Sequence, residues 1–148
     1  FIVAAASIFG WLLTATGVTA AIGQWVLGVT DQPWQFLLLA NLLMLFVGCF
    51  LEPTAAITIL VPILLPICRQ LGIDPVHFGL IMVLNLMIGL LHPPMGMVLF
   101  VLARVAKLSV ERTTVAILPW LVPLLLSLAL ITYVPAFSLW LPGYMATG

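Results

Sequence analysis

The sequence predicts an all-helical integral membrane protein in which one membrane helix is broken in its middle. Hydrophobic residues fill 65% of the 148 positions and charged residues 5%, so the chain has too little polar surface for a water-soluble core. Apolar segments of helical length follow one another along the chain. The adjacent prolines Pro93 and Pro94 interrupt one of them, so a helix entering from Phe78 should end near Leu91 and restart near Met97.

Residues 1–30 are expected to form the end of a membrane helix followed by an interfacial helix. The first thirteen residues would span about 20 Å as a helix, which is short for a crossing, and no basic leader precedes them. We therefore expect the N-terminal half of a longer protein to be absent. The interfacial helix is indicated by apolar residues at helical spacing, from Val18 through Trp25 to Val29.

Residues 34–71 contain two apolar arms, 36–50 and 54–67, with only Leu51, Glu52 and Pro53 between them. As helices they would measure about 22 and 21 Å, which is short for full crossings. Two interpretations stay open. Either both arms span the membrane and Glu52 lies in water, or the arms form a re-entrant hairpin whose tip carries Glu52 inside the membrane.

The second arm carries a stripe of residues spaced four apart, Thr54, Thr58, Pro62 and Pro66. Each proline leaves the carbonyl four residues earlier without its helical donor. Because such carbonyls are costly against lipid, this face is expected to point inward.

Residues 76–107 are expected to form the broken membrane helix. Its halves, 78–91 and 97–106, would span about 21 and 15 Å, so neither crosses alone and residues 92–96 lie near mid-depth. Unwound backbone at that depth must be covered by protein or line a polar cavity, which predicts a binding site. Peptide carbonyls there, from Gly89, His92 and Met95, suit a hard cation such as Na⁺.

Several polar side chains near the break have more than one interpretation. Asn85 shares a helix face with Gly89 and His92, and either contacts substrate or bonds to a neighbouring helix. His92 could carry a proton, bind substrate or contribute only its carbonyl. A solvated loop is expected to hold Arg69, Asp74 and His77, while Cys49 and Cys68 are expected to be buried, unpaired thiols.

Residues 113–142 are expected to form the final membrane helix and its exit into the interface. The basic residues Arg104, Lys107 and Arg112 favour a cytoplasmic position for the loop 104–112, which places the C-terminus on the other side. Four basic and four acidic residues cancel, which argues against a nucleic-acid partner.

Four motifs in order resemble the large membrane subunit of the TRAP transporters: FLEPTAAI (50–57), VPILLP (61–66), GIDPVHFG (72–79) and GLLHPPMG (89–96). The resemblance implies Na⁺-driven import of organic acids, such as C4-dicarboxylates or sialic acid, through the bacterial inner membrane, and no enzymatic activity. It also implies an elevator-type transporter built from two inverted repeats. This chain matches the second repeat, which favours the re-entrant hairpin for residues 34–71. In an inner membrane, the side opposite a cytoplasmic loop 104–112 is the periplasm, so the C-terminus is expected to be periplasmic.

By the same resemblance, a Na⁺ site lies between the hairpin tip and the break, at Gly48, Gly89, His92 and Met95. Gly48 would let the tip backbone approach the broken helix. The family usually has threonine at position 92, so the carbonyl ligand remains while a hydroxyl ligand is replaced by imidazole.

Further candidates for substrate contact or gating are Glu52, Thr54, Asn85, Pro93 and Pro94. The implied partners are a small membrane subunit, a periplasmic substrate-binding protein, the N-terminal half of the same subunit, the organic-acid substrate and the lipid bilayer.

Three alternatives stay open. One is a proton-coupled transporter or a member of another ion-transporter family. Another is an intramembrane enzyme using Glu52 and His92 as an acid–base pair, which is disfavoured because no nucleophile or metal cluster accompanies them. The third is a scaffolding subunit without a site.

Overall fold

A computed structural model of the chain describes residues 32–93 and 95–146 continuously. Before residue 32 it describes only residues 4, 8, 11, 12, 15–17, 20, 21, 24, 25 and 28. The helices predicted within residues 1–30 and the gating candidate Pro94 therefore lie largely or wholly outside the described residues. The helices of the continuous part are α3 (Pro33–Phe50), α4 (Pro53–Gln70), α5 (Pro75–Gly89), α6 (Met97–Ala106), α7 (Val110–Tyr133) and α8 (Ala136–Ala146).

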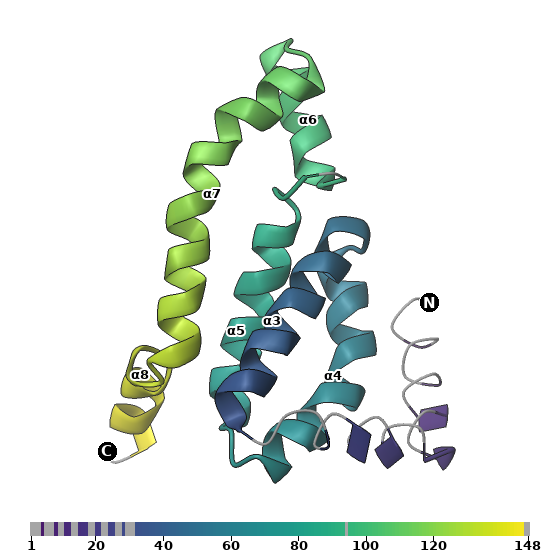
Figure 1. The fold of residues 1–148 in the computed structure, drawn as a ribbon, viewed down its shortest axis with the longest axis vertical. Coiled ribbons are helices and arrows are strands. Elements are labelled where there is room, and N and C mark those ends of the chain that lie inside the picture. The colour runs from purple at the N-terminus through teal and green to yellow at the C-terminus, as the bar shows by residue number, and fades with distance from the viewer. Residues whose placement is uncertain are drawn as a thin grey trace.

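Helix α5 lies at the centre of the packing. Figure 1 shows α3 and α4 running antiparallel as two arms beside α5, while the long helix α7 runs past α5 and α6 on the other side. Both arms contact α5 much more extensively than they contact each other. The turn between α3 and α4 lies at the level of the break between α5 and α6 (Figure 1).

The starts of three helices follow from a polar residue before a proline. Gln32, Glu52 and Asp74 each occupy the N-cap position, and the proline after each of them starts α3, α4 or α5. Proline is well tolerated there because the first backbone N–H groups of a helix have no helical acceptor. Asp74 Oδ1 also accepts hydrogen bonds from the backbone N–H groups of Val76 (2.8 Å) and His77 (3.3 Å). These caps fix where α5 begins.

The helix lengths confirm the prediction of an all-α membrane protein. Helices α3 and α4, with 18 residues each, and α7, with 24, are long and apolar enough to cross a membrane. Helices α5 and α6 are shorter, with 15 and 10 residues. The predicted interruption is present, because α5 ends at Gly89 and α6 begins at Met97.

The buried face of α4 differs from the one that the proline stripe led us to expect. Its core residues are Pro53, Ala56, Leu60, Leu64, Ile67 and Cys68. Positions 56, 60 and 64 lie two residues from the stripe, and therefore on the opposite side of the helix. Thr54 and Pro66 are exposed, and Thr58 and Pro62 are partly exposed. The prediction that this stripe points inward is therefore wrong within this chain, since apolar side chains take the core face.

His77 is the second correction, because it lies in the core and not in a solvated loop. The Asp74 cap starts α5 early enough to place His77 in the first helical turn, where it is 3% exposed. Its Nε2 lies 3.2 Å from the Thr132 carbonyl oxygen and its Nδ1 lies 2.8 Å from Ser138 Oγ. A carbonyl only accepts, so in the neutral ring Nε2 carries the hydrogen and the serine hydroxyl donates to Nδ1. These bonds join the start of α5 to the end of α7 and to α8. Arg69 and Asp74 are exposed as expected.

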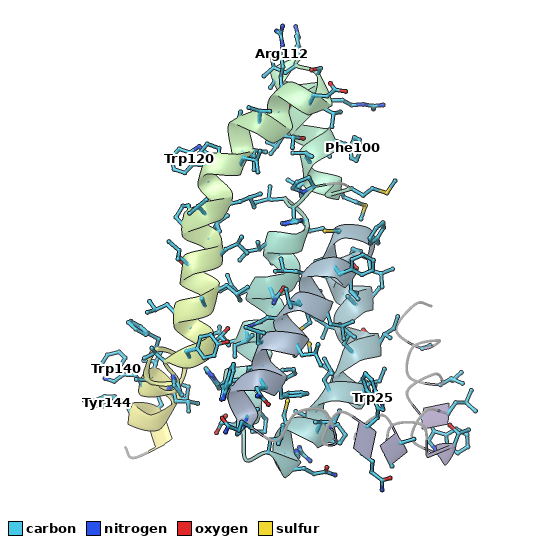
Figure 2. The ribbon with its side chains drawn as sticks, in the orientation of Figure 1. Trp25, Phe100, Arg112, Trp120, Trp140 and Tyr144 are labelled. Carbon is cyan, nitrogen blue, oxygen red and sulfur yellow. The ribbon has the colours of Figure 1, made fainter. Side chains whose placement is uncertain are left out.

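The predicted final segment, 113–142, contains two helices. Helix α7 ends at Tyr133, and α8 begins at Ala136 after Pro135, which cannot donate to a continuing helix. In Figure 2, Arg112 lies at one end of the molecule and Trp140 and Tyr144 lie near the opposite end. Trp120 projects from the outer side of α7, where its side chain is 71% exposed. Such a surface is suited to lipid or to another membrane protein.

Candidate functional site at the helix break

Helices α3 and α5 touch backbone to backbone at Gly48 and Gly89. A Cβ atom built on Gly89 would lie 2.8 Å from both the carbonyl carbon and the Cα of Gly48, and one on Gly48 would lie 3.3 Å from the Cα of Gly89. A side chain on Gly89 would therefore require the two backbones to move apart, and one on Gly48 would be a tight fit. The prediction that Gly48 lets the hairpin tip approach the broken helix is confirmed.

The loop between α5 and α6 is held by backbone hydrogen bonds and by a second close approach. The N–H of His92 donates to the Gly89 carbonyl (3.1 Å), and the N–H of Gly96 donates to the His92 carbonyl (3.2 Å). A Cβ atom on Gly96 would lie 2.3 Å from the Leu90 carbonyl oxygen. The chain therefore folds back on itself between Leu90 and Gly96, and only glycine fits there.

Cys49 contacts His92 across the junction. Its Sγ lies 3.7 Å from His92 Nδ1, and its thiol donates to the His92 carbonyl oxygen at 3.7 Å. His92 Nδ1 also lies 2.6 Å from the Pro93 carbonyl oxygen. The last turn of α3 thus contacts both the side chain and the backbone of the broken segment. Cys49 and Cys68 are both buried and free, as expected.

Glu52 caps α4 at the exposed end of the hairpin. Its carboxylate accepts hydrogen bonds from Thr54 Oγ1 (2.7 Å) and from the backbone N–H of Ala55 (3.2 Å). The structure pairs Glu52 with its own helix, whereas His92 pairs with Cys49 and Pro93. The hydrogen bonds of the two side chains therefore do not support an acid–base pair of Glu52 and His92.

Asn85 lies in the core, one turn before Gly89, and bonds to a neighbouring helix. Its side chain is 0% exposed, and its Nδ2 donates to the backbone oxygen of Asn41 (3.0 Å) and to Asn41 Oδ1 (2.7 Å). Asn41 Nδ2 donates in turn to Thr132 Oγ1 at 3.0 Å, so the network links α5, α3 and α7. Asn85 Oδ1 has no hydrogen-bond partner among the described residues.

Asn41 and Asn85 are expected to be energetically coupled. The free energy of unfolding lost when both are replaced should be smaller than the sum of the two losses from single replacements. Asn85→Leu leaves Asn41 Oδ1 without its donor, and Asn41→Leu removes the side-chain acceptor of Asn85 Nδ2 and the donor to Thr132 Oγ1, each at a cost of about 1–3 kcal/mol. The pair should show a coupling energy of roughly 1 kcal/mol in a double-mutant cycle of unfolding in detergent. Strictly additive losses would contradict a direct bond between the two side chains.

The junction offers oxygen donors suited to a hard cation. Gly48 is among the last four residues of α3 and Gly89 is the last residue of α5, where helix carbonyls lack intrahelical donors. Two carboxyl-terminal helix ends meet there, and each carries a partial negative charge. The Gly89 carbonyl accepts one hydrogen bond and retains a second lone pair, whereas the His92 carbonyl accepts from both the Gly96 N–H and the Cys49 thiol. Na⁺ coordination by such carbonyls is chemically compatible with this donor set.

Of the residues predicted for a cation site, Gly48, Gly89 and His92 meet at the junction. Met95 lies in the same loop with a 55% exposed side chain, and Pro93 lies beside the cavity next to Cys49. Glu52 and Thr54 lie at the start of α4, beyond the end of α3. Sequence reasoning missed Asn41 and the contact of Cys49 with His92. Both contacts join residues more than 40 positions apart, which local patterns do not reveal.

Comparison with known protein sequences identifies the family of this chain. A family model described as "Tripartite ATP-independent periplasmic transporter, DctM component" matches residues 1–137. The chain is 41% identical to a C4-dicarboxylate TRAP transporter large permease protein of Rhodobacter capsulatus, covering 98% of this chain and 33% of the relative. It is 46% identical to the corresponding protein of Pseudomonas aeruginosa, covering 98% and 34%.

A third relative has a different named solute. The sialic acid TRAP transporter large permease protein of Vibrio cholerae is 46% identical, covering 92% of this chain and 31% of the relative. The chain thus spans about a third of the length of these relatives. With the family match over residues 1–137, the chain belongs to the DctM component family of tripartite ATP-independent periplasmic transporters.

Proposed function

We propose that this chain forms the second repeat of the transport domain in a Na⁺-driven importer of organic acids. The observation that carries the proposal is the contact of Gly48 with Gly89, which brings the carboxyl ends of α3 and α5 together beside an unwound loop. The carbonyls of Gly48, Gly89, His92 and Met95 would hold Na⁺. Bound Na⁺ would favour the arrangement in which hairpin tip and break are joined, because a ligand shifts an equilibrium toward the state it binds better.

The proposed transport step is the movement of this compact unit across the membrane as one body. Residues 34–71 act as the re-entrant hairpin, with Glu52, Thr54, Asn85 and the two prolines at 93 and 94 as candidates for substrate contact or gating. Cations that accompany an anionic substrate offset its charge, which lowers the cost of carrying it through the bilayer.

The substrate class and the partners are proposed from the relatives' names. Relatives are named for C4-dicarboxylates, sialic acid and isethionate, so the solute is a small organic acid. A small membrane subunit, a periplasmic substrate-binding protein and the preceding part of the subunit would complete the transporter in the bacterial inner membrane. The basic residues at the α6–α7 turn favour a cytoplasmic position for it and a periplasmic C-terminus.

Reconstituted uptake tests this function. The complete protein with both partner subunits is placed in liposomes, and uptake of a panel of organic acids is measured with a Na⁺ gradient, with a proton gradient and with neither. We expect accumulation of at least one acid only when the Na⁺ gradient is present. Uptake that follows the proton gradient alone would instead support proton coupling, and uptake indifferent to both would contradict secondary active transport by this protein.

A further inference from the structure

Cys49 and His92 line a cavity at the junction of hairpin and break. The cavity has a volume of about 270 Å³ and its other walls are mainly apolar side chains of α3. Cys49 is 4% exposed and His92 is partly exposed. The thiol and imidazole thus share an otherwise apolar cavity large enough for an ion and water.

We propose that Cys49 and His92 form a binding site for a soft divalent cation such as Zn²⁺ or Cd²⁺. Sulfur and imidazole nitrogen are the donors that such ions prefer, whereas Na⁺ prefers oxygen. The two donor atoms lie 3.7 Å apart. In a tetrahedral zinc site, ordinary Zn–S and Zn–N bond lengths place sulfur and nitrogen about 3.6 Å apart. The spacing of the two donor atoms therefore suits one bridging ion, which binds once the imidazole turns away from the Pro93 carbonyl oxygen, 2.6 Å from Nδ1.

The remaining coordination positions fall to backbone oxygen or water. The His92 carbonyl oxygen lies 3.7 Å from Cys49 Sγ, which makes it the nearest candidate for a third ligand. Within residues 32–93 and 95–146 there is no group of three or more His, Cys, Asp and Glu side chains that could hold a metal. The site therefore binds reversibly and more weakly than a structural zinc site with four side-chain ligands.

Ion binding breaks a hydrogen bond of each ligand, and the hydrogen atoms involved can be followed. Without the ion, the thiol donates to the His92 carbonyl, and Nδ1 carries the hydrogen that it donates to the Pro93 carbonyl. When the ion binds, the thiol proton leaves to water as the sulfur–metal bond forms. The imidazole stays neutral, because its hydrogen passes through water from Nδ1 to Nε2 and Nδ1 binds the ion. One proton is released for each ion bound.

The bound ion joins the last turn of α3 to the loop after α5. This consequence rests on the proposed function: if hairpin tip and break separate at any step of transport, a bridging ion opposes that step. We expect micromolar Zn²⁺ to inhibit uptake and a chelator to restore it. The thiolate and imidazole ligands of Zn²⁺ are not proposed ligands of Na⁺, and the His92 carbonyl is the one candidate ligand that the two ions share.

Cadmium binding tests the site without any transport measurement. The complete purified protein is titrated with Cd²⁺, and the ultraviolet sulfur-to-cadmium charge-transfer band is followed. We expect Cys49→Ala to remove the band that saturates at the lowest Cd²⁺ concentration, and His92→Thr to weaken its binding by about tenfold or more. Cys68→Ala is the matched control, since Cys68 is also buried and free but lies in α4.

The outcomes separate this site from the proposed transport function. An unchanged band in Cys49→Ala, or no band in the unmodified protein, would overturn the metal site whatever the uptake results are. Cys49→Ser, which keeps a donor for the His92 carbonyl, serves as a second variant if the alanine variant folds poorly. In liposomes, inhibition by Zn²⁺ should disappear in Cys49→Ala and persist in Cys68→Ala. Equal inhibition in both variants would place the inhibitory ion elsewhere.

Discussion

Gly89→Ala is expected to abolish Na⁺-driven uptake and to destabilise the folded protein. The new Cβ would lie 2.8 Å from two backbone atoms of Gly48, and backbone cannot rotate away as a side chain can. The helices must separate by several tenths of an ångström, at a cost of about 1–3 kcal/mol, as in other overpacked cores. That separation also pulls apart the carbonyls proposed to hold Na⁺. Thermal unfolding in detergent and Na⁺-dependent uptake in liposomes measure the two effects.

Gly79→Ala is the matched control for this prediction. Gly79 lies in the same helix, but a Cβ there would meet no atom within 4 Å. Alanine should therefore be neutral or stabilise α5 by about 0.5–1 kcal/mol. Wild-type stability and sodium dependence in Gly89→Ala would show that the backbone contact is not required. A loss of the same size in both variants would indicate that helix propensity, and not the junction, is responsible.

Gly96→Ala is expected to have the second large effect, through the loop rather than through the helix contact. Its Cβ would lie 2.3 Å from the Leu90 carbonyl oxygen and 2.9 Å from the Leu90 carbonyl carbon. The backbone angles of Gly96 (φ −51°, ψ 115°) are accessible to alanine, so the obstacle is space and not backbone strain. The loop must open, which moves the start of α6 and the His92 carbonyl. We expect uptake at background level.

Alkylation of Cys49 reports this opening independently of transport. Cys49 is 4% exposed and contacts the backbone of His92, so opening of the loop should expose its thiol. In a Cys68→Ala background, Gly96→Ala should raise the rate of alkylation by a membrane-permeant maleimide at least severalfold. Gly79→Ala should leave that rate unchanged. A slow, wild-type rate combined with normal uptake in Gly96→Ala would contradict the close approach of Gly96 to Leu90.

Features encoded by local backbone chemistry could be predicted from the sequence. Prolines 93 and 94 mark the break, and α5 and α6 end and begin within about two residues of the predicted positions, Leu91 and Met97. Gly48 and Gly89 were recognised as close-approach positions because glycine lacks the Cβ that blocks such contacts. These signals lie within a few residues of the structure that they specify.

Features that depend on distant partners could not be predicted in the same way. His77 follows a polar, proline-containing stretch, which is typical of a loop, yet Thr132 and Ser138 satisfy both ring nitrogens in the core. The proline stripe of α4 predicts the wrong buried face, because Ala56, Leu60 and Leu64 on the opposite face bury apolar area and stabilise the packing.

The dominant contact of both arms with α5 has a consequence for biosynthesis. The ribosome makes α3 and α4 before α5, so for a time the two arms exist without the helix on which both of them rest. Two short apolar helices with few mutual contacts have little to hold them in register during that interval. Final packing of the arms must therefore wait until Gly89 has been synthesised and inserted, and nascent chains truncated before that residue should be degraded faster than longer ones.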